Sequence, residues 1–144
     1  MMITGINHSG IVVEDLERAL VFYRDVLGLQ VLARREREGG PISQVVGYAD
    51  CHLVIADVGA GDGPVLELIQ YLNPRPGRRP TEERSVLGGS HVAFNVEDIS
   101  KTYEDLLRGG ARSLNPPVEV AAGKTVCYMQ DPEGNWIELM ELRE

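Results

Sequence analysis

An internal repeat constrains the fold of this chain more than any other feature of its sequence. Residues 8–23 (HSGIVVEDLERALVFY) align without gaps with residues 91–106 (HVAFNVEDISKTYEDL), at an offset of 83. Each segment is a short β-like run followed by an acidic helix start, in which Asp15 and Asp98 are placed as N-caps at the positive end of the helix dipole. Such a repeat predicts two copies of one supersecondary unit.

The residues that follow each β-like run predict the rest of the unit. Helical spacing continues to Gly28 in the first copy and to Gly109 in the second, and glycine is the usual residue after a helix end. Short apolar runs separated by turn residues then indicate strands. They lie at 29–35, 43–49, 52–58 and 64–71 in the first half, and at 118–121, 125–130 and 135–142 in the second.

The predicted fold class is therefore α+β, with two tandem βαβββ modules. We expect the first module at 1–72, a Pro/Arg-rich linker at 73–89 and the second module at 90–144. One half alone would be a marginal domain, so the halves are expected to share a core as one structural domain. Packed side by side, they would form a cupped mixed sheet with a concave surface.

Charge and cysteine content exclude several classes of function. The formal net charge of −8 argues against a nucleic-acid partner, which would require a clustered basic surface. The one basic cluster, Arg75, Arg78 and Arg79, is predicted to be a solvated linker. No apolar stretch reaches the ~20 residues of a membrane helix, and no signal peptide is recognised, so no membrane partner is expected. With only Cys51 and Cys127 and no metal spacing, we expect a cytoplasmic protein with reduced thiols.

Each half opens with a strand histidine and closes with a strand glutamate in an apolar run: His8, Glu67, His91 and Glu138. Strand alternation puts Glu138 on the face opposite to Glu141, which we expect near solvent. Burying an unpaired carboxylate costs several kcal/mol, and a cation shared by the four residues removes that cost. Two imidazoles and two carboxylates suit one divalent metal ion, whether Zn, Ni, Co, Mn or Fe.

Other interpretations of these residues exist. A lone strand histidine is more often a satisfied core or surface residue than a ligand, and a lone strand glutamate usually meets solvent. The equivalent placement of both residue types in the two halves favours the metal site. His52 has no counterpart in the second half and is expected at the surface or at a pocket rim. Glu36, Glu38 and Gln44 flank a Gly-Gly-Pro loop and could line a cavity mouth, but a solvated loop is expected for all three.

The segments HSGIVVEDLERALVFYRDVLGL, SHVAFNVEDI and YMQDPEGNWIEL resemble the vicinal oxygen chelate superfamily. This superfamily includes glyoxalase I, methylmalonyl-CoA epimerase, extradiol dioxygenases and bleomycin-resistance proteins. The resemblance implies paired βαβββ modules around one divalent metal, a homodimer, and His8, Glu67, His91 and Glu138 as metal ligands. It also implies a small-molecule substrate that chelates the metal through two adjacent oxygens. Glu138 or Glu67 would be the catalytic base that forms an enolate.

Departures from individual family members narrow the function. Extradiol dioxygenases carry a further histidine before the Y-x-x-D-P-x-G segment, and this chain has no histidine after His91. Val12 stands where glyoxalase I has an arginine for a glutathione carboxylate, and methylmalonyl-CoA epimerase usually has glutamine at Glu67. The expected function is a metal-dependent isomerase or lyase, lactoylglutathione lyase-like or methylmalonyl-CoA epimerase-like. The alternative is an antibiotic-type binding or resistance protein without turnover. An extradiol dioxygenase is the least favoured of the three functions.

Overall fold

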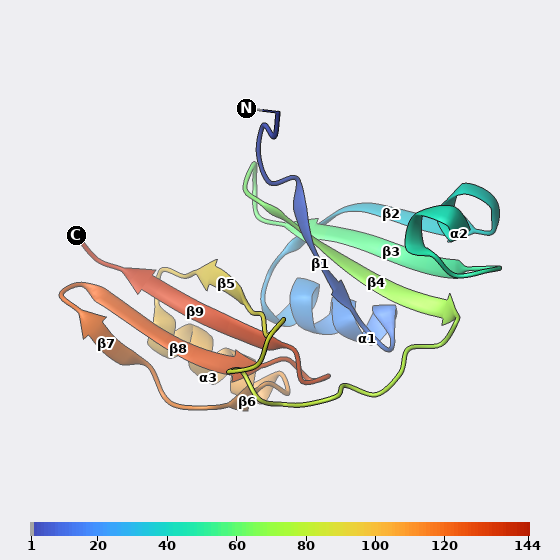
Figure 1. Cartoon of the computed structure of the whole chain (residues 1–144). Coiled ribbons are helices and arrows are strands. Elements are labelled where there is room, and N and C mark those ends of the chain that lie inside the picture. The colour runs from blue at the N-terminus through green and yellow to red at the C-terminus, as the bar shows by residue number, and fades with distance from the viewer. Residues whose placement is uncertain (1) are drawn as a thin grey trace. The chain divides into compact units, whose positions relative to one another are not determined.

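The computed structural model describes residues 2–144, which divide into two compact units, one ending at Arg78 and the other running from Arg79 to Glu144. Each unit holds one mixed β-sheet with a helix packed on one face (Figure 1). The tandem βαβββ-type architecture predicted from the repeat is confirmed. The α+β fold class is confirmed with it.

The first unit begins with β1 and ends with β4, which lie side by side in parallel. The order of strands in its sheet is β1-β4-β3-β2, and the other two pairings are antiparallel. Its elements are β1 (His8–Val12), α1 (Leu16–Leu20), the π-helical turns η1 (Val21–Val26), β2 (Gln30–Glu38), α2 (Gly40–Val46), β3 (His52–Gly59) and β4 (Val65–Asn73).

The second unit repeats this topology, because its first and last strands, β5 and β9, are again parallel neighbours. Its elements are β5 (Val92–Asn95), α3 (Ile99–Arg108), β6 (Arg112–Ser113), β7 (Val118–Ala121), β8 (Lys124–Gln130) and β9 (Trp136–Leu142). Both β6 and β7 pair with β8, where the first unit has the single strand β2. The interruption falls at Pro116 and Pro117, which have no N–H to donate to a strand ladder.

The strand predicted at 43–49 is wrong, because α2 covers most of these residues. Gly39 precedes this helix, Pro41 lies in its first turn, and Gly47 ends it in a left-handed conformation with a φ of 76°. Ile42 and Val46, four residues apart, pack against a buried cluster made by Cys51, Leu53 and Ile55. A short apolar run fits a strand or a buried helix equally well, and helical spacing decides this case.

The helices α1 and α3 are capped in the same two ways. Asp15 accepts a hydrogen bond from the backbone N–H of Arg18, and Asp98 accepts one from Lys101 at 2.9 Å, as predicted for N-caps. The closing strand adds a second cap in each unit. Gln70 Oε1 accepts from the N–H of Leu16 and Glu141 Oε2 accepts from that of Ile99, both at 2.8 Å.

The expectation that Glu141 lies near solvent is therefore wrong. Its exposed fraction is 2 %, and it lies on the helix-facing side of β9. The helix N-terminus explains this position, because its free N–H groups and positive dipole end stabilise a carboxylate. Glu141 also pairs with the exposed Arg143. The glutamate buried against the helix is Glu141, and Glu138 lies on the opposite face.

No helix within residues 2–144 combines the length and apolar character that a membrane crossing requires. Cys51 and Cys127 are both free and buried.

Burial raises the pKa of the Cys127 thiol to about 11, with a smaller contribution from the negative charge of Glu138. The thiol of Cys127 therefore loses its proton at a lower pH in the unfolded chain than in the folded protein. We expect the free energy of unfolding to fall by up to about 2–3 kcal/mol between pH 9 and pH 11 through this group. Urea unfolding of wild type and Cys127→Ala across this range is the measurement. Equal pH slopes in the two proteins would contradict the assignment.

Candidate metal centre

The first unit brings His8 and Glu67 together, because β1 and β4 are parallel neighbours and both side chains leave the face opposite α1. His8 Nε2 lies 3.7 Å from Glu67 Oε2. His8 Nδ1 lies 2.7 Å from Asn7 Oδ1, and an amide oxygen can only accept. Asn7 and Glu67 thus contact the two ring nitrogens of His8, Asn7 at Nδ1 and Glu67 at Nε2.

The second unit brings His91 and Glu138 together in the same way. His91 immediately precedes β5, Glu138 lies on the neighbouring β9, and His91 Nε2 lies 3.1 Å from Glu138 Oε2. The exposure of the two pairs also matches. The side chains of His8 and His91 are 43% and 40% exposed, and those of Glu67 and Glu138 are 15% and 14% exposed. The four predicted ligands thus come together as two equivalent pairs, one in each unit.

The residues present suit a divalent metal. Metal–ligand bonds of roughly 2.0–2.2 Å place two ligand atoms of one ion about 3.0–3.5 Å apart, close to the separation within each pair. Imidazole nitrogen and carboxylate oxygen are also ligands that borderline divalent ions accept. No group of three or more metal-ligating side chains gathers within the described range of residues 2–144. Each unit therefore offers half of the predicted ligand set.

Glu67 has a cationic partner that the sequence analysis missed. Arg35 on β2 binds Asp57 through both guanidinium ends, at 2.6 and 3.0 Å, and also donates to Glu67 Oε2 at 2.8 Å. Asp57 and Glu67 are direct cross-strand partners on β3 and β4, so Arg35 separates two like charges. Asp57 is the lone acid in the apolar run HLVIADVG, and the argument applied to the strand glutamates would have identified it.

Glu138 lies in different surroundings. Its cross-strand partner on β8 is Tyr128, at the position that Asp57 occupies in the first unit. Tyr128 meets His91 edge to face with ring centroids 4.9 Å apart, and its hydroxyl lies 3.3 Å from His91 Nε2. Burial and the charge of Glu138 raise the pKa of Tyr128, while the positive charge of Arg84 lowers it. Among residues 2–144, His91 is the one ion-pair partner found for Glu138.

Other polar residues singled out from the sequence lie outside the two pairs. His52 Nε2 meets Glu36 Oε1 at 2.6 Å on neighbouring strands, and Glu38 directly opposes His52 across β2 and β3. Glu36 and Glu38 belong to β2 and Gln44 to α2, so the loop predicted for them is wrong, but all three are exposed, as expected.

The turn before β9 is built around the buried Asp131. Its Oδ1 accepts from the backbone N–H groups of Glu133 and Asn135, and its Oδ2 accepts from the Asn135 side chain, at 2.8–2.9 Å. Gly134 allows the turn with a φ of 94°. This turn fixes the register of β9, which decides that Glu138 and not Glu141 faces away from α3.

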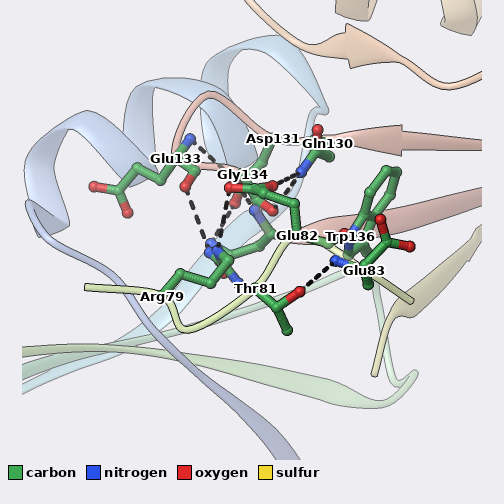
Figure 2. A network of polar contacts seen from close by, with 10 residues as sticks. Arg79, Thr81, Glu82, Glu83, Gln130, Asp131, Glu133, Gly134 and Trp136 are labelled. Carbon is green, nitrogen blue, oxygen red and sulfur yellow. Dashed lines mark hydrogen bonds and ion pairs between the residues drawn. The ribbon is translucent and has the colours of Figure 1, made fainter. Parts of the chain in front are cut away.

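Arg79, Glu82 and Glu83 lie beside this turn (Figure 2). Arg79 donates to Asn135 Oδ1 at 2.8 Å, Glu82 pairs with Gln130, and the Trp136 indole N–H donates to the Glu82 carbonyl at 3.1 Å. Arg79 therefore contacts the turn, and the solvated linker predicted for Arg75, Arg78 and Arg79 is wrong at this residue.

Comparison with known proteins decides the family. The model of the Glyoxalase/Bleomycin resistance protein/Dioxygenase superfamily matches residues 5–139. The chain belongs to this superfamily. The resemblance inferred from its motifs is thereby confirmed.

Relatives within the superfamily cover nearly the whole chain. A glyoxalase family protein from Bacillus cereus has a crystal structure that matches with a TM-score of 0.90 and 29% identity, over 99% of this chain and 97% of that one. Mouse mitochondrial methylmalonyl-CoA epimerase is 32% identical over 138 residues, which are 93% of this chain and 71% of the epimerase. A probable lactoylglutathione lyase from Synechocystis is 29% identical over 139 residues, 93% of this chain and 92% of that protein.

Proposed function

We propose that this protein is a divalent-metal-dependent isomerase or lyase that removes a proton from the carbon next to a substrate carbonyl. The observation that carries the proposal is the equivalent His–Glu pair in each unit, His8 with Glu67 and His91 with Glu138. A structural role does not explain why both units keep a half-exposed imidazole against a largely buried carboxylate. Relatives named as lactoylglutathione lyases and as an epimerase support the same reaction class.

The four side chains would hold one metal ion, with neutral imidazoles and ionised carboxylates as ligands. The bound ion would supply Lewis acidity that stabilises the negative charge developing on a substrate with two adjacent oxygens. The ligands would meet either within one chain or across a homodimer. In both arrangements each chain contributes two pairs, so one ion per chain is expected.

The surroundings of the two glutamates favour Glu138 as the base. Glu67 Oε2 accepts from Arg35, and Arg35 is itself held by Asp57, so this carboxylate is fixed in place. Glu138 has His91 and the neutral Tyr128 beside it. A base must exchange a proton with the substrate and change its contacts as it does so, which suits the less restrained carboxylate. Glu67 would then serve as a fixed ligand.

Solvent exchange tests the proposal. Full-length protein is loaded with Zn, Ni, Co, Mn or Fe and incubated in D₂O with a panel of 2-oxoaldehyde thiol adducts, acyl-CoA thioesters and keto-sugars. The proposal predicts that deuterium enters the carbon next to the carbonyl of at least one substrate only when metal is present. Tight binding of a panel member without any exchange would instead identify a protein that sequesters a small molecule.

A further inference from the structure

Arg84 is a cation in contact with β9, the strand of Glu138, and it has no role in the reaction described above. Its guanidinium lies over the ring of Trp136, with the carbon Cζ 4.6 Å from the ring centroid. Trp136 and Glu138 are two residues apart on β9 and share a face, so they are separated by about 7 Å along the strand. Arg84 therefore lies against the same face of β9 that carries the candidate base, and its positive charge acts on Tyr128.

Backbone contacts hold the main chain on both sides of Arg84. On one side, the Glu82 carbonyl accepts the Trp136 indole N–H at 3.1 Å. On the other, the N–H of Gly89 bonds to the Val86 carbonyl at 2.9 Å and closes a tight turn that leads to His91. A Cβ at position 89 would lie 2.5 Å from the Arg84 carbonyl oxygen, so this turn requires glycine. The same turn thus supports Arg84 and leads the chain into the candidate site.

The donors of Arg84 remain available. A contact with an indole face uses none of the five N–H donors of a guanidinium as a hydrogen bond to an oxygen, and these donors suit a carboxylate or phosphate. No ion pair or hydrogen bond of this guanidinium is found among residues 2–144, although Glu82 and Glu83 are close in the chain. The other arginine of this segment, Arg79, already binds Asn135.

We propose that Arg84 and Trp136 form an anion-binding subsite that holds a carboxylate or phosphate group of the substrate. Trp136 and Glu138 are next neighbours on one face of β9, so the anionic group would be bound apart from the carbon that loses its proton. A chain of net charge −8 repels anionic substrates at long range, and the guanidinium of Arg84 offsets this locally. The substrate role rests on the proposed function, and anion binding itself does not.

The single tryptophan of the chain makes the test direct, because its indole N–H gives one signal in a proton–nitrogen correlation spectrum. Full-length protein, as purified and after dialysis against a chelator, is titrated with inorganic phosphate or acetate at constant ionic strength. The proposal predicts a saturable shift of the indole signal in both preparations. Arg84→Met should raise the anion concentration at half-saturation by at least about tenfold. Arg84→Lys should raise it by less, because lysine keeps the positive charge but lacks the paired N–H donors of a guanidinium.

Arg75→Met is the matched control, since Arg75 is an exposed arginine of the same linker. It should leave the titration unchanged. A shift that does not saturate, or one that is equal in wild type and Arg84→Met, would overturn the subsite. A shift that persists in Arg84→Met and disappears on metal removal would assign the anion to the metal and also overturn it. Because the chelated protein carries no metal, these outcomes are independent of whether the proposed reaction occurs.

Discussion

Replacing Glu138 by glutamine should lower metal-dependent deuterium exchange by at least about 100-fold, the usual contribution of a general base. Glutamine preserves the shape of the side chain and its place on β9, but it cannot accept a proton. The amide oxygen of glutamine is still a metal ligand, although a weaker one, so saturating metal should fill the site of the variant. The loss should therefore appear in the exchange rate measured at saturating metal. The measurement is the initial rate of deuterium incorporation into the substrate, followed by NMR.

Glu141→Gln is the control for this variant, because it changes a carboxylate three residues away on the helix-facing side of the same strand. We expect it to retain exchange within about twofold of wild type, since Glu141 binds the N–H of Ile99 and no site residue. Undiminished exchange in Glu138→Gln would exclude Glu138 as the base and direct the search to Glu67.

Glu141→Leu is expected to lower the free energy of unfolding by about 2–3 kcal/mol. The substitution leaves the buried N–H of Ile99 without its acceptor and removes a negative charge from the N-terminus of α3. Arg143, the other partner of Glu141, is largely exposed, so loss of that pair contributes little. Urea unfolding followed by circular dichroism is the measurement.

The first unit supplies the control for this second prediction, because it caps α1 with Gln70 at the equivalent position. Glu141→Gln should therefore cost less than about 1 kcal/mol, since the amide oxygen still accepts from Ile99. If glutamine destabilised the protein as much as leucine, the ionic interactions of Glu141 would outweigh the cap. That result would contradict the role assigned to the backbone hydrogen bond.

The repeat made the fold predictable, because it fixed two β–α starts, and alternation along β4 and β9 then placed Glu67 and Glu138 on the faces away from the helices. The position of Glu141 could not be predicted in the same way. Alternation placed it opposite Glu138, but the hydrogen bond to Ile99 depends on a contact between residues 42 positions apart. The correspondence between Glu141 and Gln70 becomes visible only when each closing strand is seen packed on the helix of its own unit.

The sequence pattern also could not predict which residues contact the candidate ligands and their strands. Arg35 reaches Glu67 diagonally across β3, so its role depends on the register of three strands. Arg84 lies in a linker that was predicted to end only at residue 89, and its contact with Trp136 depends on the turn at Gly89. Local residue type determines secondary structure and faces, whereas these contacts arise from the way separate segments pack.

Metal content after dialysis tests most directly whether the two pairs hold one ion. Purified protein is loaded, dialysed and analysed by elemental analysis for wild type, His8→Ala, Glu67→Ala, His91→Ala and Glu138→Ala. We predict one ion per chain in wild type. Each variant should lose it, because removing a ligand weakens affinity by at least about 100-fold. Two ions per chain in wild type, or stoichiometric metal in a variant of either pair, would contradict a shared site.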